Sequence, residues 1–233
     1  MTPREFRYEF DLLYNNIMSD MAPGLDDYEV SLFLTEAQEK VVTQLYSGVN
    51  FTGGFESAEK VRRYLANLIR RVVMNKDTNP ALPAPETRLY HGKYLEYDIG
   101  VNDNLMVFIS ERVVLKDTEC CERDKSVNVT PIKYDELNKV MENPFRRPNN
   151  RQALRVDDET HAVRILSRTD IVEYSYDYLK RPDPIIVSNL PAGFSINGVS
   201  TEQTSELDES LHRTILDYAV QLAAASWANN NKN

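Results

Sequence analysis

Cysteine, histidine and glycine are scarce in this sequence, and each shortage argues against a class of site. Its 233 residues include two cysteines, three histidines and eight glycines. Cys120 and Cys121 are adjacent, so a disulfide between them would close a strained ring, and no CxxC pair exists for a metal or redox site. His91, His161 and His212 lack a second ligand residue at metal-binding spacing. The sequence therefore predicts no metal, no cofactor and a protein of a reducing cytosol.

Motifs that enzymes build around glycine or serine are also absent. The sequence has no GxGxxG, no P-loop and no GxSxG. The pair Gly53–Gly54 is typical of a turn before a helix. The acid pairs Asp26–Asp27 and Asp157–Asp158 stand where acids cap helices or bound strands. We therefore predict no catalytic residues and a protein that is not an enzyme.

Long apolar runs and an excess of positive charge are missing as well. No stretch approaches the roughly 20 apolar residues of a membrane span, and the first residues form no signal-like segment. We therefore expect neither secretion nor a membrane partner. The 27 Lys and Arg residues against 36 Asp and Glu give a formal net charge of −9, so the whole chain repels phosphate. Binding to nucleic acid would require a local basic patch.

Three helices are expected in residues 1–75. The pair Thr2–Pro3 is typical of a helix start, and Asp26–Asp27 can cap a second helix that reaches about Tyr46. Ser57 can cap the third helix. In the first helix, the apolar residues recur at spacings of four, three and four: Phe6, Phe10, Leu13 and Ile17. The third helix repeats this spacing at Val61, Leu65, Leu68 and Val72.

A change in composition separates these helices from a β-rich region. Residues 76–86 contain three prolines, which remove backbone donors and favour extended geometry, so they are the expected linker. Residues 87–204 form the expected β-rich insertion, because short runs rich in Tyr, Val and Ile alternate with turn residues. The expected strands are 89–99, 105–115, 127–132, 162–167 and 171–179. One helix, 134–142, interrupts them and stops before Asn143–Pro144.

A last helix is expected over residues 205–227, where Ser205 and Asp208 fit a capping box. Its apolar face contains Leu207, Leu211, Ile215 and Leu222. Residues 228–233 are polar and are expected to form a flexible tail. The predicted fold class is α+β, with a helical bundle from both chain ends and a β-rich insertion between them.

Aromatic residues mark two candidate interfaces. Alternation places Tyr174, Tyr176 and Tyr178 on one face of a strand, which suits either an interface or packing inside the subunit. Trp227 follows the packed length of the last helix. It either anchors another subunit or folds back onto the bundle.

Arginines mark a third candidate interface. Arg146, Arg147 and Arg151 lie in an expected exposed loop, where they suit an acidic neighbour. The pairs Arg62–Arg63 and Arg70–Arg71 flank the apolar stripe of the third helix and favour a solvated helix face, with binding of phosphate or an acidic partner as the alternative.

Four stretches of the sequence carry a resemblance to a known group of proteins. They are residues 5–9, 25–39 and 178–185, together with the closing helix that runs to Trp227. In these stretches the chain resembles virion structural proteins of short-tailed bacteriophages, in particular ring proteins of the crAss-like gut phages. The order of elements also resembles head-to-tail adaptor proteins, which form a ring beneath the portal.

The resemblance implies a non-enzymatic subunit of a neck or tail ring, located in the virion and assembled in the cytoplasm of the bacterial host. The implied partners are further copies of the chain in a homo-oligomeric ring, with a dodecamer as one stoichiometry, the portal protein and the adjacent tail ring proteins. Phage DNA would pass through the lumen without sequence-specific binding. The residues alone leave two other classes open: a small cytosolic hydrolase or nucleotide-binding enzyme, and a regulatory binding module.

Overall fold

The structure is a computed structural model that describes the chain except for residues 19–23, 49–54, 91–93, 117–123, 160–161 and 231–233. The chain forms two compact units. One contains Met1–Leu68 and Arg181–Asn233 and is called the helical unit below. The other contains Ile69–Lys180 and is called the sheet unit. This composition confirms the α+β fold class.

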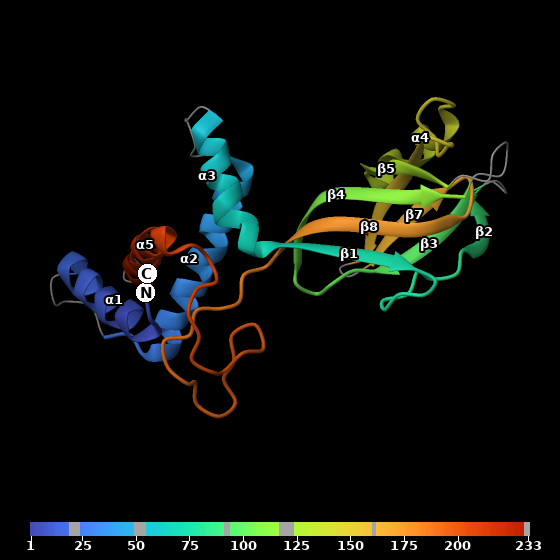
Figure 1. Cartoon of the computed structure of the whole chain (residues 1–233). Helices are drawn as coiled ribbons and strands as arrows, with labels where there is room; N and C mark the ends of the chain where they lie inside the picture. The colour runs from blue at the N-terminus through green and yellow to red at the C-terminus, as the bar shows by residue number, and fades with distance from the viewer. Residues whose placement is uncertain (19–23, 49–54, 91–93, 117–123, 160–161, 231–233) are drawn as a thin grey trace. The chain divides into compact units, whose positions relative to one another are not determined.

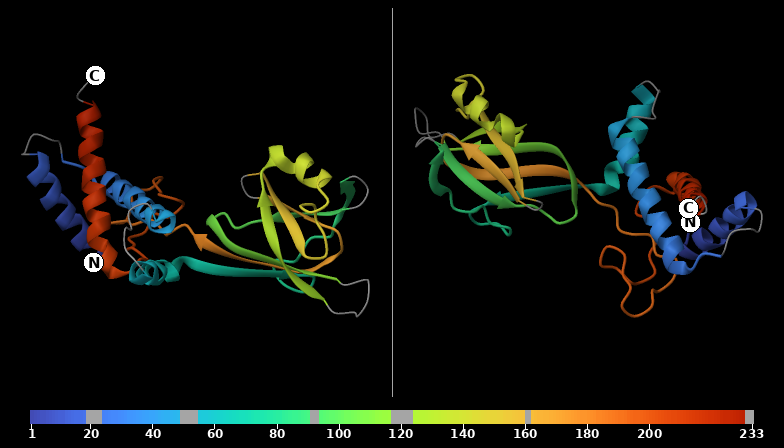
Figure 2. Two further views of the ribbon diagram at one scale, coloured as in Figure 1. Left: turned by 90° about the horizontal axis from the view of Figure 1, so that it is seen from above. Right: turned by 180° about the vertical axis from the view of Figure 1, so that it is seen from behind.

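The helical unit brings together helices from both ends of the chain. Its helices are α1 (Pro3–Met18), α2 (Asp27–Ser47), α3 (Phe55–Leu65) and α5 (Glu209–Asn230). The red α5 lies against the blue helices α1 and α2 in Figure 2. None of the helices within the described residues has the length and hydropathy of a membrane span.

Capping chemistry explains where the first two helices begin. The Thr2 hydroxyl accepts a hydrogen bond from the Glu5 N–H at 3.3 Å, and the Glu5 carboxylate accepts one from the Thr2 N–H at 2.7 Å. Asp26 and Glu29 form the same reciprocal pair at the start of α2, at 2.8 and 3.0 Å. Gly48 closes α2 with a φ of 67°, which favours glycine. Both predicted helix starts are confirmed.

The buried face of α1 differs from the predicted one at its C-terminal end. Phe6, Phe10 and Tyr14 are buried, whereas Ile17 is 55% exposed. Phe6, Phe10 and Tyr14 are spaced four and four residues apart, and this spacing also places them on one helix face. The Tyr14 ring stacks on Phe10 with ring centroids 5.9 Å apart. The buried face of α1 therefore does not include Ile17, although the predicted apolar stripe does.

Among the described residues, the sheet unit contains eight strands in one sheet, which is visibly curled in Figure 1. The strands are β1 (Ile69–Asn75), β2 (Glu86–Tyr90), β3 (Tyr94–Gly100), β4 (Leu105–Leu115), β5 (Lys125–Ile132), β6 (Gln152–Glu159), β7 (Ala162–Ser167) and β8 (Ile171–Lys180). Their order across the sheet is β1-β8-β4-β5-β6-β7-β3-β2. Neighbouring strands are antiparallel except β5 and β6, which are parallel.

The two faces of the sheet bury different side chains. Ala153 of β6 belongs to the main core, while Leu154 and Val156 of the same strand belong to a second cluster with α4 (Leu137–Glu142). A 3-10 turn, Tyr134–Glu136, precedes α4. The predicted helix over 134–142 is thus observed as a 3-10 turn followed by one short α-helix.

The largest correction concerns residues 69–75, which were expected to continue the third helix. They form β1 and pair with β8 in an unbroken antiparallel register from Ile69 to Asn75. Val72 and Met74 pack against the sheet core, and Val73 is 36% exposed. The apolar residues of this segment fit both the spacing of a helix and the alternation of a strand. Pairing with the distant strand β8 favours the strand.

The predicted domain boundaries also need correction. Residues 76–86 are not a linker between domains, because Leu82 is buried in the core of the sheet unit and its N–H donates to the Asn75 carbonyl at 3.0 Å. The chain instead passes between units at Leu68–Ile69 and at Lys180–Arg181. Residues 181–204, expected in the β-rich insertion, belong to the helical unit.

The last helix begins and ends later than expected. Asp208 caps α5 by accepting hydrogen bonds from the N–H and hydroxyl of Ser210, at 3.0 and 2.6 Å. Ser205 instead accepts a hydrogen bond from the Leu207 N–H at 3.1 Å, so the predicted capping box was wrong. Residues 228–230 are helical rather than a flexible tail. Residues 231–233 lie outside the described part of the chain.

Candidate interface surfaces

Histidine and carboxylate groups form no metal cluster within the described residues. His91 and His161 lie outside the described residues. His212 is buried: its Nδ1 lies 2.7 Å from the Met1 amino group, and its Nε2 lies 3.3 Å from the Leu207 carbonyl oxygen. Burial, followed by the charge of the Met1 amino group, lowers the pKa of His212. These contacts assign His212 a structural role at the start of α5.

The lowered pKa of His212 predicts a loss of stability in mild acid. The unfolded imidazole takes up a proton near a pKa of about 6.5, while the folded imidazole stays neutral to a lower pH. The unfolded state therefore binds more protons, and the free energy of unfolding falls as the pH drops from about 6.5 toward the folded pKa. We expect His212→Asn to flatten this dependence, as measured by urea unfolding between about pH 7 and pH 5. Parallel curves for the two proteins would contradict the assignment.

The three tyrosines of β8 belong to the core of the sheet unit. Tyr174, Tyr176 and Tyr178 are between 0% and 6% exposed. They do share one strand face, as predicted, but that face points into the curled sheet. The interface alternative for these residues is therefore wrong, and packing within the subunit is correct. Burial raises the pKa of Tyr176 to about 12, with a smaller contribution from Tyr178.

A buried ionic network lies beside these tyrosines. The Arg155 guanidinium donates to the Glu111 carboxylate, and the Tyr174 hydroxyl donates to the second oxygen of that carboxylate at 2.7 Å. The guanidinium carbon also lies 4.0 Å from the centre of the Phe108 ring. Burial raises the pKa of Glu111, and Arg155 and the Tyr174 hydroxyl act in the opposite direction. The network joins β4, β6 and β8 inside the sheet unit.

The predicted arginine cluster lies on an exposed, hydrogen-bonded loop, which we call the 143–152 loop. Arg146, Arg147 and Arg151 are exposed, and Phe145 beside them is 88% exposed. The Gln152 side-chain amide donates to the carbonyl oxygens of residues 145, 146 and 147, at 3.4, 2.9 and 3.1 Å. These bonds fix the loop backbone while its arginines and its phenylalanine face outward.

Additional side chains hold this loop and extend its basic surface. The Asn143 side chain accepts a hydrogen bond from the Phe145 N–H at 2.9 Å, and the Asn149 side chain accepts one from the Arg151 N–H at 2.8 Å. Arg147 lines a recess of about 440 Å³ together with Arg168 of the β7–β8 turn and Tyr94 of β3. No carboxylate among the described residues forms an ion pair with the three loop arginines or with Arg168.

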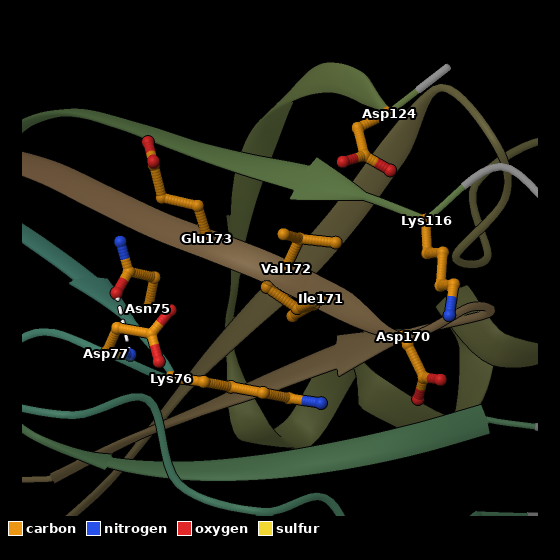
Figure 3. A pocket seen from close by; sticks show the side chains of 9 residues that line it. All are labelled: Asn75, Lys76, Asp77, Lys116, Asp124, Asp170, Ile171, Val172 and Glu173. Atoms are coloured by element: carbon orange, nitrogen blue, oxygen red, sulfur yellow. Dashed lines mark hydrogen bonds between the residues drawn. The ribbon is translucent and has the colours of Figure 1, made fainter. Parts of the chain in front are cut away.

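A second recess, of about 420 Å³, has the opposite character (Figure 3). Its four carboxylates come from Asp77 after β1, Asp124 before β5, and Asp170 and Glu173 at the start of β8. Two ammonium groups, from Lys76 and Lys116, also line it, so the formal charge of the lining is −2. Val172 contributes apolar surface to the recess, and Ile171 beside it is buried in the sheet core. We call it the acidic recess.

Within the helical unit, an extended segment after β8 is hydrogen-bonded along α2. The Gln38 side chain donates to the Asp183 carbonyl at 2.7 Å, and the Thr35 hydroxyl accepts from the Ile185 N–H at 3.1 Å. The Ser31 hydroxyl accepts from the Val187 N–H at 3.1 Å. The Ser205 hydroxyl donates to the side-chain amide oxygen Oε1 of Gln38 at 2.5 Å. Buried polar side chains of one α2 face thus hold residues 183–205 in place.

The family of the chain follows from comparison with known proteins. A family model described as phage tail ring protein 3/4 matches residues 1–233. The chain belongs to this family. It is 35% identical over 229 residues to "Ring protein 3" of Bacteroides phage crAss001, covering 97% of this chain and 96% of that protein. It is also 33% identical over 237 residues to "Ring protein 4/5" of the same phage, covering 97% and 94%. The predicted resemblance to ring proteins of crAss-like phages is confirmed.

Two of the stretches that carried this resemblance contact each other in the ring-protein fold. Residues 25–39 include the polar face of α2, and residues 178–185 begin the segment that it holds. The buried partners Ser31, Thr35 and Gln38 were not singled out from the sequence. Their spacing of four and three on an expected apolar face was the available signal.

Trp227 lies within α5 rather than beyond it. Its side chain is half-buried, and no hydrogen bond or ring contact joins it to another described residue. The last fully buried residue of α5 in the described part of the chain is Ala223. Trp227 therefore stands after the packed portion of the helix, as expected, although the helix itself continues to Asn230.

Proposed function

We propose that this chain is a non-enzymatic structural subunit of a ring in the neck or tail of a bacteriophage, close to the portal. The observation that carries the proposal is the match of the family model to residues 1–233, with both ring proteins aligned over 97% of the chain. A subunit of such a ring needs complementary surfaces and no catalytic group. The basic 143–152 loop and the acidic recess are surfaces of this kind.

In the proposed assembly, copies of the chain form a closed homo-oligomeric ring, with a dodecamer as the expected stoichiometry. Helices α1, α2 and α5 form the bundle from both chain ends and contact the neighbouring copies. Phage DNA passes through the lumen, where a chain with a formal charge of −9 favours sliding over binding. The portal protein and the adjacent tail ring proteins are the expected partners above and below.

The composition of purified virions tests this function. We expect quantitative mass spectrometry to find the chain in a fixed ratio to the portal protein, and to find it in tails detached from capsids. A chain that is abundant in infected cells and absent from purified virions would contradict the proposal and favour an enzyme or a regulatory protein.

Trp227 is the proposed anchor to a neighbouring ring. Removing residues 226–233 takes away the half-buried indole but no residue of the buried α5 face, which ends at Ala223. We therefore expect the melting temperature of the free subunit to change little and its incorporation into virions to be lost.

Calorimetry of the truncated chain and its recovery in virions are the two measurements for this prediction. Trp227→Ala in the full-length chain is the matched control, because it removes the indole and keeps the rest of the helix end. A truncated subunit that unfolds would show that Trp227 supports the core of the helical unit instead.

A further inference from the structure

The 143–152 loop has the properties of a preformed protein contact. Its phenylalanine is the most exposed of the large hydrophobic side chains in the described residues, at 88%. The three hydrogen bonds from the Gln152 amide hold the backbone, so little conformational freedom is lost when the loop docks. Aromatic residues and arginine are the types enriched in the centres of protein interfaces. The free cations beside Phe145 select a negatively charged counterpart.

The acidic recess offers that counterpart on the same unit. Four carboxylates around it outnumber two ammonium groups, and no ion pair among the described residues neutralises them. In Figure 3, the side chains of Asp170, Glu173 and Asp77 lie around those of Ile171 and Val172. Its volume of about 420 Å³ lies within the range of pockets that bind small molecules.

Strand register places the two surfaces at the same end of the curled sheet. Asn75 of β1 pairs with Glu173 of β8, and the end of β4 pairs with the starts of β8 and β5; these strands form the acidic recess. The start of β6, which follows the 143–152 loop, lies beside the end of β7, and Ser167 of β7 pairs with Leu95 of β3. In the sheet order, the strands of the acidic recess come first and the strands beside the 143–152 loop follow. The two surfaces therefore lie at the same end of the sheet but on different strands.

We propose that the 143–152 loop of one copy docks in the acidic recess of the next copy, with Phe145 as the apolar anchor and Arg146 and Arg147 facing the carboxylates. This inference rests on the proposed ring function. Two different patches on one subunit make a heterologous contact, and repetition of such a contact by a rotation generates a closed ring.

Other occupants of the loop fit the observations less well. The DNA backbone supplies phosphates for the arginines but provides no apolar recess for Phe145. A second copy supplies carboxylates for the arginines together with the partly exposed apolar side chain of Val172 for Phe145. In a homo-oligomeric ring, a second copy is also the neighbour that every subunit has.

Photo-crosslinking inside virions tests the contact directly. We replace Phe145 with p-benzoyl-phenylalanine, irradiate purified virions and identify the crosslinked peptides by mass spectrometry. The expected product has twice the 26.8 kDa mass of the subunit and joins position 145 to residues 75–77 or 170–173 of a second copy. Crosslinks to another virion protein, to DNA or to a different face of this chain would each overturn the docking proposal. Absence of the chain from virions would instead overturn the proposed ring function.

Charge exchange supplies an independent test with a matched control. Arg146→Glu/Arg147→Glu and Asp170→Lys/Glu173→Lys should each reduce incorporation into virions by at least about tenfold, because each places like charges together. The chain that carries all four substitutions should recover most of the loss, since the attraction is restored with reversed sign. Arg62→Glu/Arg63→Glu makes the same charge change on exposed residues of α3 and should leave incorporation unchanged. Circular dichroism checks that each variant folds. If the folded chain with all four substitutions did not regain incorporation into virions, the contact would be contradicted.

Discussion

Replacing Arg155 with alanine is expected to destabilise the sheet unit by about 3–5 kcal/mol, because it leaves a buried carboxylate without its cation. The side chains of Arg155 and Glu111 are 9% and 5% exposed. Bulk water therefore solvates the remaining carboxylate poorly. The substitution also removes the guanidinium that lies 4.0 Å from the centre of the Phe108 ring.

Two companion variants show whether the charge causes this loss. In Arg155→Met/Glu111→Gln, the network is neutral, an oxygen acceptor remains for the Tyr174 hydroxyl, and the methionine still covers Phe108. We expect this double variant to regain most of the lost stability. Arg71→Ala breaks the exposed ion pair with Asp177, where Arg71 is 67% exposed, and should cost no more than about 1 kcal/mol. Urea unfolding followed by tyrosine absorbance measures all three, and a double variant as unstable as Arg155→Ala would assign the loss to packing.

Replacing Ile215 with alanine is expected to destabilise the helical unit by about 2–5 kcal/mol. Ile215 is fully buried in α5, where that helix lies against α1 and α2. The substitution removes apolar contacts and leaves a cavity between helices that start from opposite ends of the chain. The lost contacts and the cavity both lower the free energy of unfolding. The decrease should therefore be several-fold larger than for a substitution of an exposed residue.

Leu222→Ala is the matched control for Ile215→Ala, because Leu222 lies on the same helix and is only half-buried. It should cost clearly less. The single tryptophan of the chain, Trp227, lies on α5 and reports the unfolding of the helical unit by fluorescence. Equal losses for Leu222→Ala and Ile215→Ala would contradict the assignment of Ile215 to the core.

The parts of the fold that depend on neighbouring residues were predictable from the sequence. Helix starts at Thr2 and Asp26 follow from side chains three residues apart, and the end of α4 follows from Pro144. The strand 105–115 was predicted with the bounds that β4 has. In each case the deciding interaction lies within a few residues.

Elements decided by distant partners were not predictable in this way. The segment 69–75 becomes a strand because β8, about a hundred residues later, pairs with all of it. β6 was missed because Arg155 and Asp157 interrupt its apolar pattern, and the buried position of Arg155 depends on Glu111 of another strand. The last capping box failed because Ser205 bonds with Gln38 of α2 instead of opening a helix.

The candidate surfaces also differ in whether their residues are close together in the sequence. The arginines of the 143–152 loop are consecutive or nearly so, and the sequence alone identified them. The acidic recess is assembled from three places, the residues after β1, the residue before β5 and the start of β8, which are far apart in the sequence. The tyrosine alternation indicated a shared face, and only the curl of the sheet determined that this face is buried.

A symmetric reconstruction of the neck and tail of the phage that encodes this chain tests the account most directly. We predict that the helical unit and the sheet unit fit one closed ring around the DNA channel, with each 143–152 loop against the sheet unit of the next copy. A reconstruction in which every ring between the portal and the tail tip is built from other proteins would contradict it.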